Sequence, residues 1–352
     1  MSLSLSLPVS EQFAVRDIVN AGRGVIATRN IAAGTLILES GPPAFHVIFK
    51  TYAKETCAFC FAWDRGRTLP VRDNVTAKVF CTSECQAEWL KEQGKPGVES
   101  WLSLAAYVRS KKRGTNADEI MSDGPKPDLN DMDAAWREAE KRAKTLQKLR
   151  TATTSQITKS DWKSAQAVIQ KMDEDIDVNM LSYTLSGALY RHRHSSKWQS
   201  EVLALAMDDR PHKTQHDLDI SCNSYVQLTS VIALELLPSL TPELCRTMTM
   251  ADNHNAFGIR AGGEDCEEYM GYGVYPSSSY FNHSCSPNVN KRRVGRSWEF
   301  SAARDIAAGE ECCITYLGGD EKDLDRRARQ SRLHEVWGFH CYCNLCTAKA
   351  ST

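Results

Sequence analysis

The sequence predicts an α+β fold in which one β-rich domain is interrupted by a cysteine-rich segment and a long helical insert. Residues 28–34 and 303–309 share the order Arg-x-Ile-Ala-Ala-Gly, and both lie beside glycine-punctuated apolar segments typical of strands and turns. Between them, residues 84–108, 181–207 and 222–240 carry apolar side chains at helical spacing. The two similar stretches are therefore expected to belong to one domain that the middle of the chain divides.

Local patterns define the elements along the chain. Residues 13–42 predict strand, turn and strand, with Gly22-Arg23-Gly24 as a tight turn that needs positive φ. Residues 110–133, rich in Lys, Asp, Gly and Pro, predict an exposed loop. The charged run 136–150 predicts a solvated helix with acidic and basic side chains at i,i+4 spacing. After residue 251, glycines punctuate short apolar pieces, which indicates that β-structure returns.

Composition limits the function classes. The 43 basic and 44 acidic residues give a net charge of −1, so direct nucleic-acid binding is not expected. The first ten residues lack a charged leader, and no apolar run approaches the ~20 residues needed to span a bilayer, so we expect no signal peptide and no membrane segment. These features predict an intracellular protein of the nucleus and/or cytoplasm. Its 13 cysteines would there be mostly reduced, which makes closely spaced pairs metal ligands.

Two such pairs are Cys57-x2-Cys60 and Cys81-x3-Cys85. Each pair supplies two thiolates from one tight turn, and two pairs joined by a loop can close a tetrahedral zinc site. The alternative is four unrelated core thiols, which the paired spacing disfavours. Three more cysteines, Cys341, Cys343 and Cys346, cluster near the end of the chain, whereas a closed zinc site needs four ligands.

The stretch 280–289, Tyr-Phe-Asn-His-Ser-Cys-Ser-Pro-Asn-Val, is the most informative in the chain. An aromatic lead-in runs into polar residues, and Pro-Asn then stops regular hydrogen bonding, so the polar side chains are expected where the backbone leaves a regular element. A surface turn with a buried cysteine is the alternative. The terminal cysteines, Gly309-Glu310-Glu311 and Ile314-Thr315-Tyr316 favour a binding site instead.

With these motifs, residues 22–346 resemble SET-domain protein lysine methyltransferases of the subgroup whose SET domain is split by a MYND-type zinc finger. The resemblance implies five parts: the N-terminal part of the SET domain, a reduced MYND-type finger, a helical insert, the SET catalytic core and a post-SET zinc segment, at 1–50, 51–92, 93–250, 251–320 and 321–352. Longer members also carry a helical C-terminal domain. This chain stops six residues after Cys346, so a more open substrate groove is expected.

The resemblance also implies two zinc ions. Cys57, Cys60, Cys81 and Cys85 match the ligands of the first MYND site, while the ligands of the second MYND site are missing. Cys285 matches the family's fourth ligand to the terminal cysteines. The zinc would hold the end of the chain over the active site.

The expected cofactor is S-adenosylmethionine, and the resemblance implies the residues that contact it: Arg23, Gly24, Asn255, Asn282, His283 and Phe339. Tyr316 matches the tyrosine that lines the lysine channel at the point of methyl transfer, whereas Glu310 and Glu311 are expected to shape a turn. Taken singly, these residues have ordinary alternatives: a turn glycine or asparagine, a buried histidine, a core phenylalanine and a structural tyrosine.

The predicted function is methyl transfer from S-adenosylmethionine to a lysine of a histone or non-histone protein. No general base is required, because desolvation and the nearby sulfonium charge both disfavour the ammonium form of lysine. A non-catalytic SET and zinc-finger scaffold that binds partners is the alternative. Methylation of a small molecule or nucleic acid has no support in the sequence. We expect a monomer that binds a protein substrate; the sequence does not indicate which lysine, how many methyl groups are added, or whether the finger binds partners.

Overall fold

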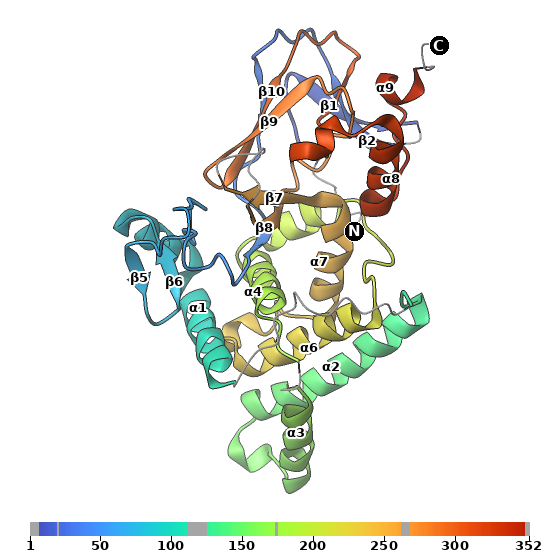
Figure 1. Cartoon of the computed structure of the whole chain (residues 1–352). Coiled ribbons are helices and arrows are strands. Elements are labelled where there is room, and N and C mark those ends of the chain that lie inside the picture. Colours follow the sequence, from blue (N-terminus) through green and yellow to red (C-terminus); the bar gives the residue numbers. More distant parts are fainter. Residues whose placement is uncertain (1–6, 20, 112–124, 173–174, 262–267, 349–352) are drawn as a thin grey trace. The chain divides into compact units, whose positions relative to one another are not determined.

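The computed structural model describes residues 7–19, 21–111, 125–172, 175–261 and 268–348 (Figure 1). The chain divides into two compact units. The first comprises Met1–Ala44, Gln199–Ala206 and Asn253–Thr352, and the second comprises Phe45–Trp198 and Met207–Asp252. Both ends of the chain and one short internal segment thus form the first unit.

Antiparallel strands from both ends of the chain build the first unit, where blue and orange segments adjoin in Figure 1. One sheet has the order β1-β2-β11, a second has the order β3-β10-β9, and β7 pairs with β8. The bounds are β1 (Phe13–Ile18), β2 (Gly22–Ala27), β3 (Leu36–Glu39), β7 (Ala256–Arg260), β8 (Tyr269–Val274), β9 (Val289–Val294), β10 (Ser297–Ala302) and β11 (Glu311–Cys312).

The two similar stretches found in the sequence pair with each other. Ile31 and Ile306 exchange backbone hydrogen bonds of 2.9 Å in both directions. The Asp305 side chain accepts from the Ala33 amide at 2.8 Å, and the Asn30 side chain accepts from the Ala308 amide at 2.9 Å. The prediction that both stretches lie in one domain is confirmed.

Aromatic and aliphatic side chains together form the core of the first unit. Phe281, which precedes the Asn-His-Ser-Cys motif, stacks on Phe300 of β10 at 4.6 Å between ring centroids and meets the edge of Phe13 at 6.1 Å. Both Phe281 and Phe300 are fully buried. A large ring packed in the core restricts the backbone on either side of it. The polar residues that follow Phe281 are therefore held in a fixed position.

The C-terminal part of the first unit contains η5 (Gly319–Asp323), α8 (Arg326–Trp337) and α9 (Asn344–Thr347). The Asp325 side chain caps α8 at its start by accepting from the Ala328 amide at 2.8 Å. Gly338 ends the helix in the left-handed conformation, with φ of 74°. This turn reverses the chain and places Phe339 directly after α8.

The second unit is helical apart from β4 and one hairpin. Within it α2 packs against α3 and α6, and α4 packs against β4 and α6. Its elements are β4 (Phe45–Ile48), β5 (Val71–Asp73), β6 (Lys78–Phe80), α1 (Ser83–Ser110), α2 (Leu129–Thr151), η2 (Thr154–Gln156), α3 (Lys159–Met172), α4 (Val178–Arg193), α5 (Ser195–Lys197), α6 (Gln215–Val231) and η4 (Leu234–Leu236). The π-helical turn η3 (Trp198–Val202) and helix α7 (Pro242–Asn255) each have residues in both units.

Several local expectations differ from the structure. The turn expected at Gly22-Arg23-Gly24 is the start of β2, although Gly22 does have a φ of 69°. The loop expected over 110–133 ends earlier, because α2 begins at Leu129; residues 112–124 lie outside the described part. The helix expected over 181–207 stops at Arg193, and the one expected over 222–240 spans Gln215–Val231.

The charged helix was expected to be solvated, but α2 buries one face. Trp136, Ala139, Ala143 and Leu146 are buried. Their spacing of three and four residues is that of a helix with one apolar stripe, and this stripe packs against α6. Within the described residues, no helix is long and apolar enough to cross a membrane.

Candidate active site

A cleft of about 970 Å³ lies in the first unit. The structure brings six of the seven residues singled out for the cofactor and the chemistry to its lining. These are Arg23, Asn255, Asn282, His283, Tyr316 and Phe339. They come from β2, the end of α7, the Asn-His-Ser-Cys stretch, the segment after β11 and the turn after α8.

Gly24, the seventh residue, contacts the side chains that line the cleft. A Cβ atom at this position would lie 2.7 Å from Asn282 Nδ2, from Glu311 Oε1 and from Ile18. The Asn282 amide donates to the Glu311 carboxylate at 2.9 Å. Glycine is therefore required here because an amide and a carboxylate approach its backbone closely.

His283 connects the cleft to the terminal cysteines. Its Nδ1 accepts a hydrogen bond from the Tyr316 backbone amide at 3.0 Å, and its Nε2 lies 3.3 Å from Cys285 Sγ. Burial lowers the pKa of His283 to about 4, with smaller contributions from Lys291 and Arg329. The imidazole is thus neutral at pH 7, and the accepting Nδ1 assigns its proton to Nε2, the atom that faces the thiol.

The Tyr316 hydroxyl is fixed at the edge of the cleft. It donates a hydrogen bond of 3.0 Å to the Phe281 carbonyl oxygen. The ring lies 5.5 Å from Trp337 and 6.2 Å from Phe339, the latter edge-on. Burial raises the pKa of Tyr316, so the hydroxyl stays protonated and can both donate and accept.

Arg23 and Asn255 bind a segment of the helical insert that belongs to the first unit. The Arg23 guanidinium donates to the Ala204 carbonyl and lies 5.1 Å over the Tyr280 ring. The Asn255 amide donates to the Ala206 carbonyl at 2.8 Å. Leu205 and Ala206 line the cleft. Both side chains therefore hold part of the cleft wall in place.

A smaller pocket of about 400 Å³ adjoins the cleft, and we call it the aromatic pocket. Four residues line both spaces: His254, Ser279, Tyr316 and Trp337. The aromatic side chains of Phe257, Tyr269, Phe281 and Trp298 also line the pocket, together with charged ones: Arg260, Lys291, Arg293, Glu321 and Arg332. Tyr316 thus stands where the cleft meets the aromatic pocket.

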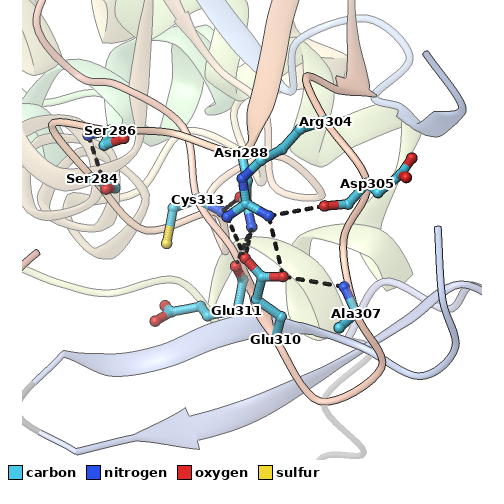
Figure 2. A network of polar contacts seen from close by, with 9 residues as sticks. All are labelled: Ser284, Ser286, Asn288, Arg304, Asp305, Ala307, Glu310, Glu311 and Cys313. Atoms are coloured by element: carbon cyan, nitrogen blue, oxygen red, sulfur yellow. Dashed lines mark hydrogen bonds and ion pairs between the residues drawn. The ribbon is translucent and has the colours of Figure 1, made fainter. Parts of the chain in front are cut away.

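The structure separates the roles of the two adjacent glutamates, which were both expected to shape a turn. Glu310 does so, because its carboxylate accepts from Arg304 at 2.5 Å, from the Ala307 amide at 3.1 Å and from Asn288 at 3.0 Å. Figure 2 shows the Glu311 carboxylate pointing away from this network. Both glutamates line the cleft, and it is the Glu311 carboxylate that accepts from Asn282.

Eight of the cysteines form two clusters, each with four sulfur atoms within 4.8 Å of one another. The first cluster is Cys57, Cys60, Cys81 and Cys85; the second is Cys285, Cys341, Cys343 and Cys346. A hydrogen bond with Cys60 lowers the pKa of the Cys57 thiol to about 5, while burial raises the pKa of the Cys81 thiol in the same cluster. Four converging sulfurs fit tetrahedral zinc at both sites, as the sequence predicted.

The second cluster is fixed to the fold from two directions. Cys285 Sγ lies 3.6 Å from Cys346 Sγ and 3.9 Å from Cys341 Sγ, which joins the Asn-His-Ser-Cys stretch to the end of the chain. The Gln330 side chain of α8 donates to the Cys341 carbonyl at 2.6 Å and accepts from the Cys341 amide at 3.0 Å. Phe339, two residues before Cys341, is held against the cleft by these contacts.

Comparison with known proteins identifies this arrangement. The SET domain model matches residues 22–317, most of the chain. The chain belongs to the SET-domain family. The predicted resemblance is thereby confirmed, and the matched range includes both Arg-x-Ile-Ala-Ala-Gly stretches and Tyr316.

One relative, a yeast protein, matches this SET-domain chain over nearly its whole length. The potential protein lysine methyltransferase SET6 of Saccharomyces cerevisiae is 26% identical, and the match covers 97% of this chain and 96% of that protein. A SET and MYND domain-containing protein of Dictyostelium discoideum is 35% identical over 30% of this chain and 24% of its own length. A crystal structure of the SET domain of LSMT bound to lysine and AdoHcy covers 95% of this chain and 54% of that chain, with 11% identity and a TM-score of 0.28. That likeness is too weak to add to the family assignment.

Sequence reasoning missed several residues of the SET-domain site. Leu205 and Ala206 come from a helical insert with no local signal of a binding role. Ser279 and Trp337, which line both spaces, lie within three residues of Asn282 and Phe339. Their closeness to those two predicted residues was a usable signal.

Proposed function

We propose that this protein is an S-adenosylmethionine-dependent protein-lysine N-methyltransferase. The observation that carries the proposal is the position of Tyr316, which lines both the cleft of about 970 Å³ and the aromatic pocket of about 400 Å³. A methyltransferase needs its two reactants in separate sites that meet at one point, so that the reacting atoms come within attack distance. The name of the yeast relative supports the same reaction class.

The cleft fits the proposed cofactor. When bound, S-adenosylmethionine would supply a methyl group on a sulfonium. The half-buried ring of Phe339 offers an aromatic face for a base, and the Glu311 carboxylate beside Asn282 offers acceptors for an amino-acid end. Gly24 lets both polar side chains reach the backbone. Arg23 and Asn255 act through the wall segment that they hold.

The aromatic pocket fits the alkyl chain and amine of a lysine. Aromatic faces in this pocket attract an ammonium or methylammonium group. An unperturbed lysine has a pKa near ~10.4, but desolvation in such a pocket disfavours the charged form. The protonated Tyr316 hydroxyl, held by the Phe281 carbonyl, orients the neutral amine without acting as a base.

The zinc sites have different proposed roles. Zinc at the second cluster would fix the turn that carries Phe339 and so complete the cleft. The first cluster lies in the second unit and would order the β5–β6 hairpin and the start of α1. Loss of the first zinc should therefore affect the cleft less than loss of the second.

A whole-lysate assay with labelled S-adenosylmethionine, followed by mapping of the modified sites, tests the proposal. The wild-type chain should label lysines on particular proteins, and Tyr316→Phe should label far fewer or leave a different number of methyl groups. If the wild-type chain binds the cofactor but labels no protein, the scaffold alternative replaces the enzyme. We propose a monomer that acts on an accessible lysine of a protein.

A further inference from the structure

Both ring nitrogens of His283 already have partners within the protein. Nδ1 accepts from the Tyr316 backbone amide at 3.0 Å, and Nε2 lies 3.3 Å from Cys285 Sγ. The residue is 9% exposed, and its ring centroid lies 5.4 Å from that of Tyr316 and 6.0 Å from that of Phe339. An imidazole has two nitrogens that form hydrogen bonds, so this side chain has no polar atom left for a ligand in the cleft.

The two contacts require the same tautomer of the imidazole. Nδ1 accepts from an amide and therefore carries no proton, which places the proton on Nε2. Cys285 belongs to the second cluster, and a thiolate that binds zinc has no proton to donate. The Nε2–H group is thus the donor to the Cys285 sulfur, and the Tyr316 amide is the donor to the other side of the ring.

The contact from His283 differs from the other polar contact that reaches the second cluster from a side chain of α8. The Arg329 guanidinium interacts electrostatically with Cys285 and Cys346. That interaction adds positive charge beside the sulfurs and ends there. The contact from His283 continues through the ring to the backbone of Tyr316, the residue that lines both the cleft and the aromatic pocket.

We infer that His283 is a positioning residue that connects Tyr316 to the second zinc site. The connection runs from Cys285 Sγ through the imidazole to the Tyr316 amide, and the hydroxyl of the same tyrosine is held by the Phe281 carbonyl. The inference rests on the proposed function only for the catalytic role of Tyr316. It assigns both nitrogens of His283 to the protein and leaves hydrogen bonding of the cofactor to other residues of the cleft.

Two substitutions each keep one of the two contacts. Glutamine places an amide N–H near the position of Nε2, so His283→Gln keeps the donor to Cys285 and lacks the acceptor for the Tyr316 amide. Asparagine places a carbonyl oxygen near the position of Nδ1, so His283→Asn keeps that acceptor and lacks the donor. Each variant is therefore the matched control for the other.

The reactivity of Cys285 reports the first contact. Iodoacetamide is added to the zinc-loaded full chain, and mass spectrometry measures alkylation of Cys285 against Cys57, whose hydrogen bonds come from Cys60 and backbone amides. In His283→Asn, alkylation of Cys285 and release of one zinc to a chelator should be about tenfold faster, because outer partners of metal ligands typically have effects of this size. His283→Gln should stay within about twofold of the wild type.

Hydrogen exchange at the Tyr316 amide reports the second contact. Exchange should be faster than wild type in His283→Gln, which lacks the acceptor, and close to wild type in His283→Asn. The two variants should therefore have opposite effects in the two measurements. Equal effects of both variants in both measurements are expected if His283 only fills space, and they would overturn the inference.

The tautomer of the wild type gives a test that needs no substitution. In ¹⁵N NMR spectra of the zinc-loaded chain, the His283 ring is identified by its contact with the Tyr316 amide proton. Its own proton should be on Nε2. A proton on Nδ1 overturns the inference, because that nitrogen could not then accept from the amide.

These measurements need no methyl transfer, so they decide the inference even if the proposed function fails. If lysines are labelled in the lysate assay, His283→Gln should reduce labelling at saturating S-adenosylmethionine about tenfold, while cofactor affinity by calorimetry stays within about twofold of the wild type. A loss of affinity as large as the loss of labelling would show that the imidazole binds the cofactor, which overturns the inference and leaves the proposed function standing.

Discussion

The Tyr316 hydroxyl donates a hydrogen bond of 3.0 Å to the carbonyl of Phe281, the residue immediately before Asn282. The Tyr316 backbone amide in turn donates to His283 at 3.0 Å. One residue thus binds both sides of the Asn282-His283 pair. The proposed catalytic hydroxyl and the proposed cofactor residues are therefore positioned by the same short stretch.

Tyr316→Phe should separate chemistry from binding. It removes one hydrogen bond, which costs about 1 kcal/mol of stability, but it keeps the ring and the backbone contact to His283. Cofactor affinity measured by calorimetry should change less than about twofold, while turnover falls by about 10²-fold, as for a lost transition-state interaction. An equal loss of affinity and turnover would show that the hydroxyl acts only in binding.

Gly24→Ala should damage the cleft through sterics alone. The new methyl group would lie 2.7 Å from Asn282 Nδ2 and Glu311 Oε1, so their hydrogen bond must break or the strand must shift. We expect a loss of about 1–3 kcal/mol in the free energy of unfolding and a loss of cofactor binding. Gly318→Ala is the control, because nothing lies within 4 Å of the added atom and its φ is −124°. Similar behaviour of the two variants would contradict this account.

Asn255→Ala should loosen the cleft wall. The change removes the 2.8 Å hydrogen bond to the Ala206 carbonyl, so hydrogen exchange at residues 204–206 should accelerate and cofactor affinity should fall by about five- to tenfold. The exposed Asn290 of β9 provides a control position. Weakened cofactor binding with unchanged exchange would instead indicate that Asn255 contacts the cofactor directly.

Elemental analysis of the purified protein should find two zinc ions per chain. The count rests on the two clusters of four sulfur atoms within the described residues. Cys343→Ser should lose one zinc and the cofactor with it, because the second cluster supports the turn that carries Phe339. Cys60→Ser should lose the other zinc and keep measurable cofactor affinity. Three zinc ions, or the same loss of cofactor in both variants, would be inconsistent with this assignment.

His212 should make the protein less stable in mild acid. It is 5% exposed, and burial lowers its pKa to about 4. Because the unfolded chain binds a proton near pH ~6.5 while the folded protein does not, stability is retained above that pH and falls as the pH drops toward 4. Between pH 7 and pH 5, the free energy of unfolding measured by urea titration should fall by about 1–2 kcal/mol less in His212→Gln than in the wild type. Equal losses would show that His212 titrates normally.

Short motifs with a fixed chemical requirement could be predicted from the sequence. The spacing of Cys57, Cys60, Cys81 and Cys85 defined a metal site, because each pair needs only a tight turn. The buried face of α2 was also visible in the spacing of Trp136, Ala139, Ala143 and Leu146, but its many charges suggested a solvated helix. The apolar periodicity was the better guide.

Contacts between distant segments could not be predicted in the same way. The bond from Asn255 to the Ala206 carbonyl depends on where the insert crosses the first unit, and no local pattern records that path. The separation of Glu310 from Glu311 has the same cause. Adjacent residues at a strand point to opposite sides, and only the tertiary structure decides which side meets Asn282.

The pairing of the two Arg-x-Ile-Ala-Ala-Gly stretches decides when, during synthesis, the first unit can fold. The hydrogen bond from Ala33 to Asp305 spans 272 residues, and that from Ala308 to Asn30 spans 278. The whole insert must therefore be synthesised before the N-terminal strands can pair with the C-terminal ones. Until β11 has been synthesised, one edge of β2 has unpaired backbone groups. During that interval the open edge of β2 favours aggregation. Stalling synthesis before residue 303 should leave a chain that has its finger but no cleft.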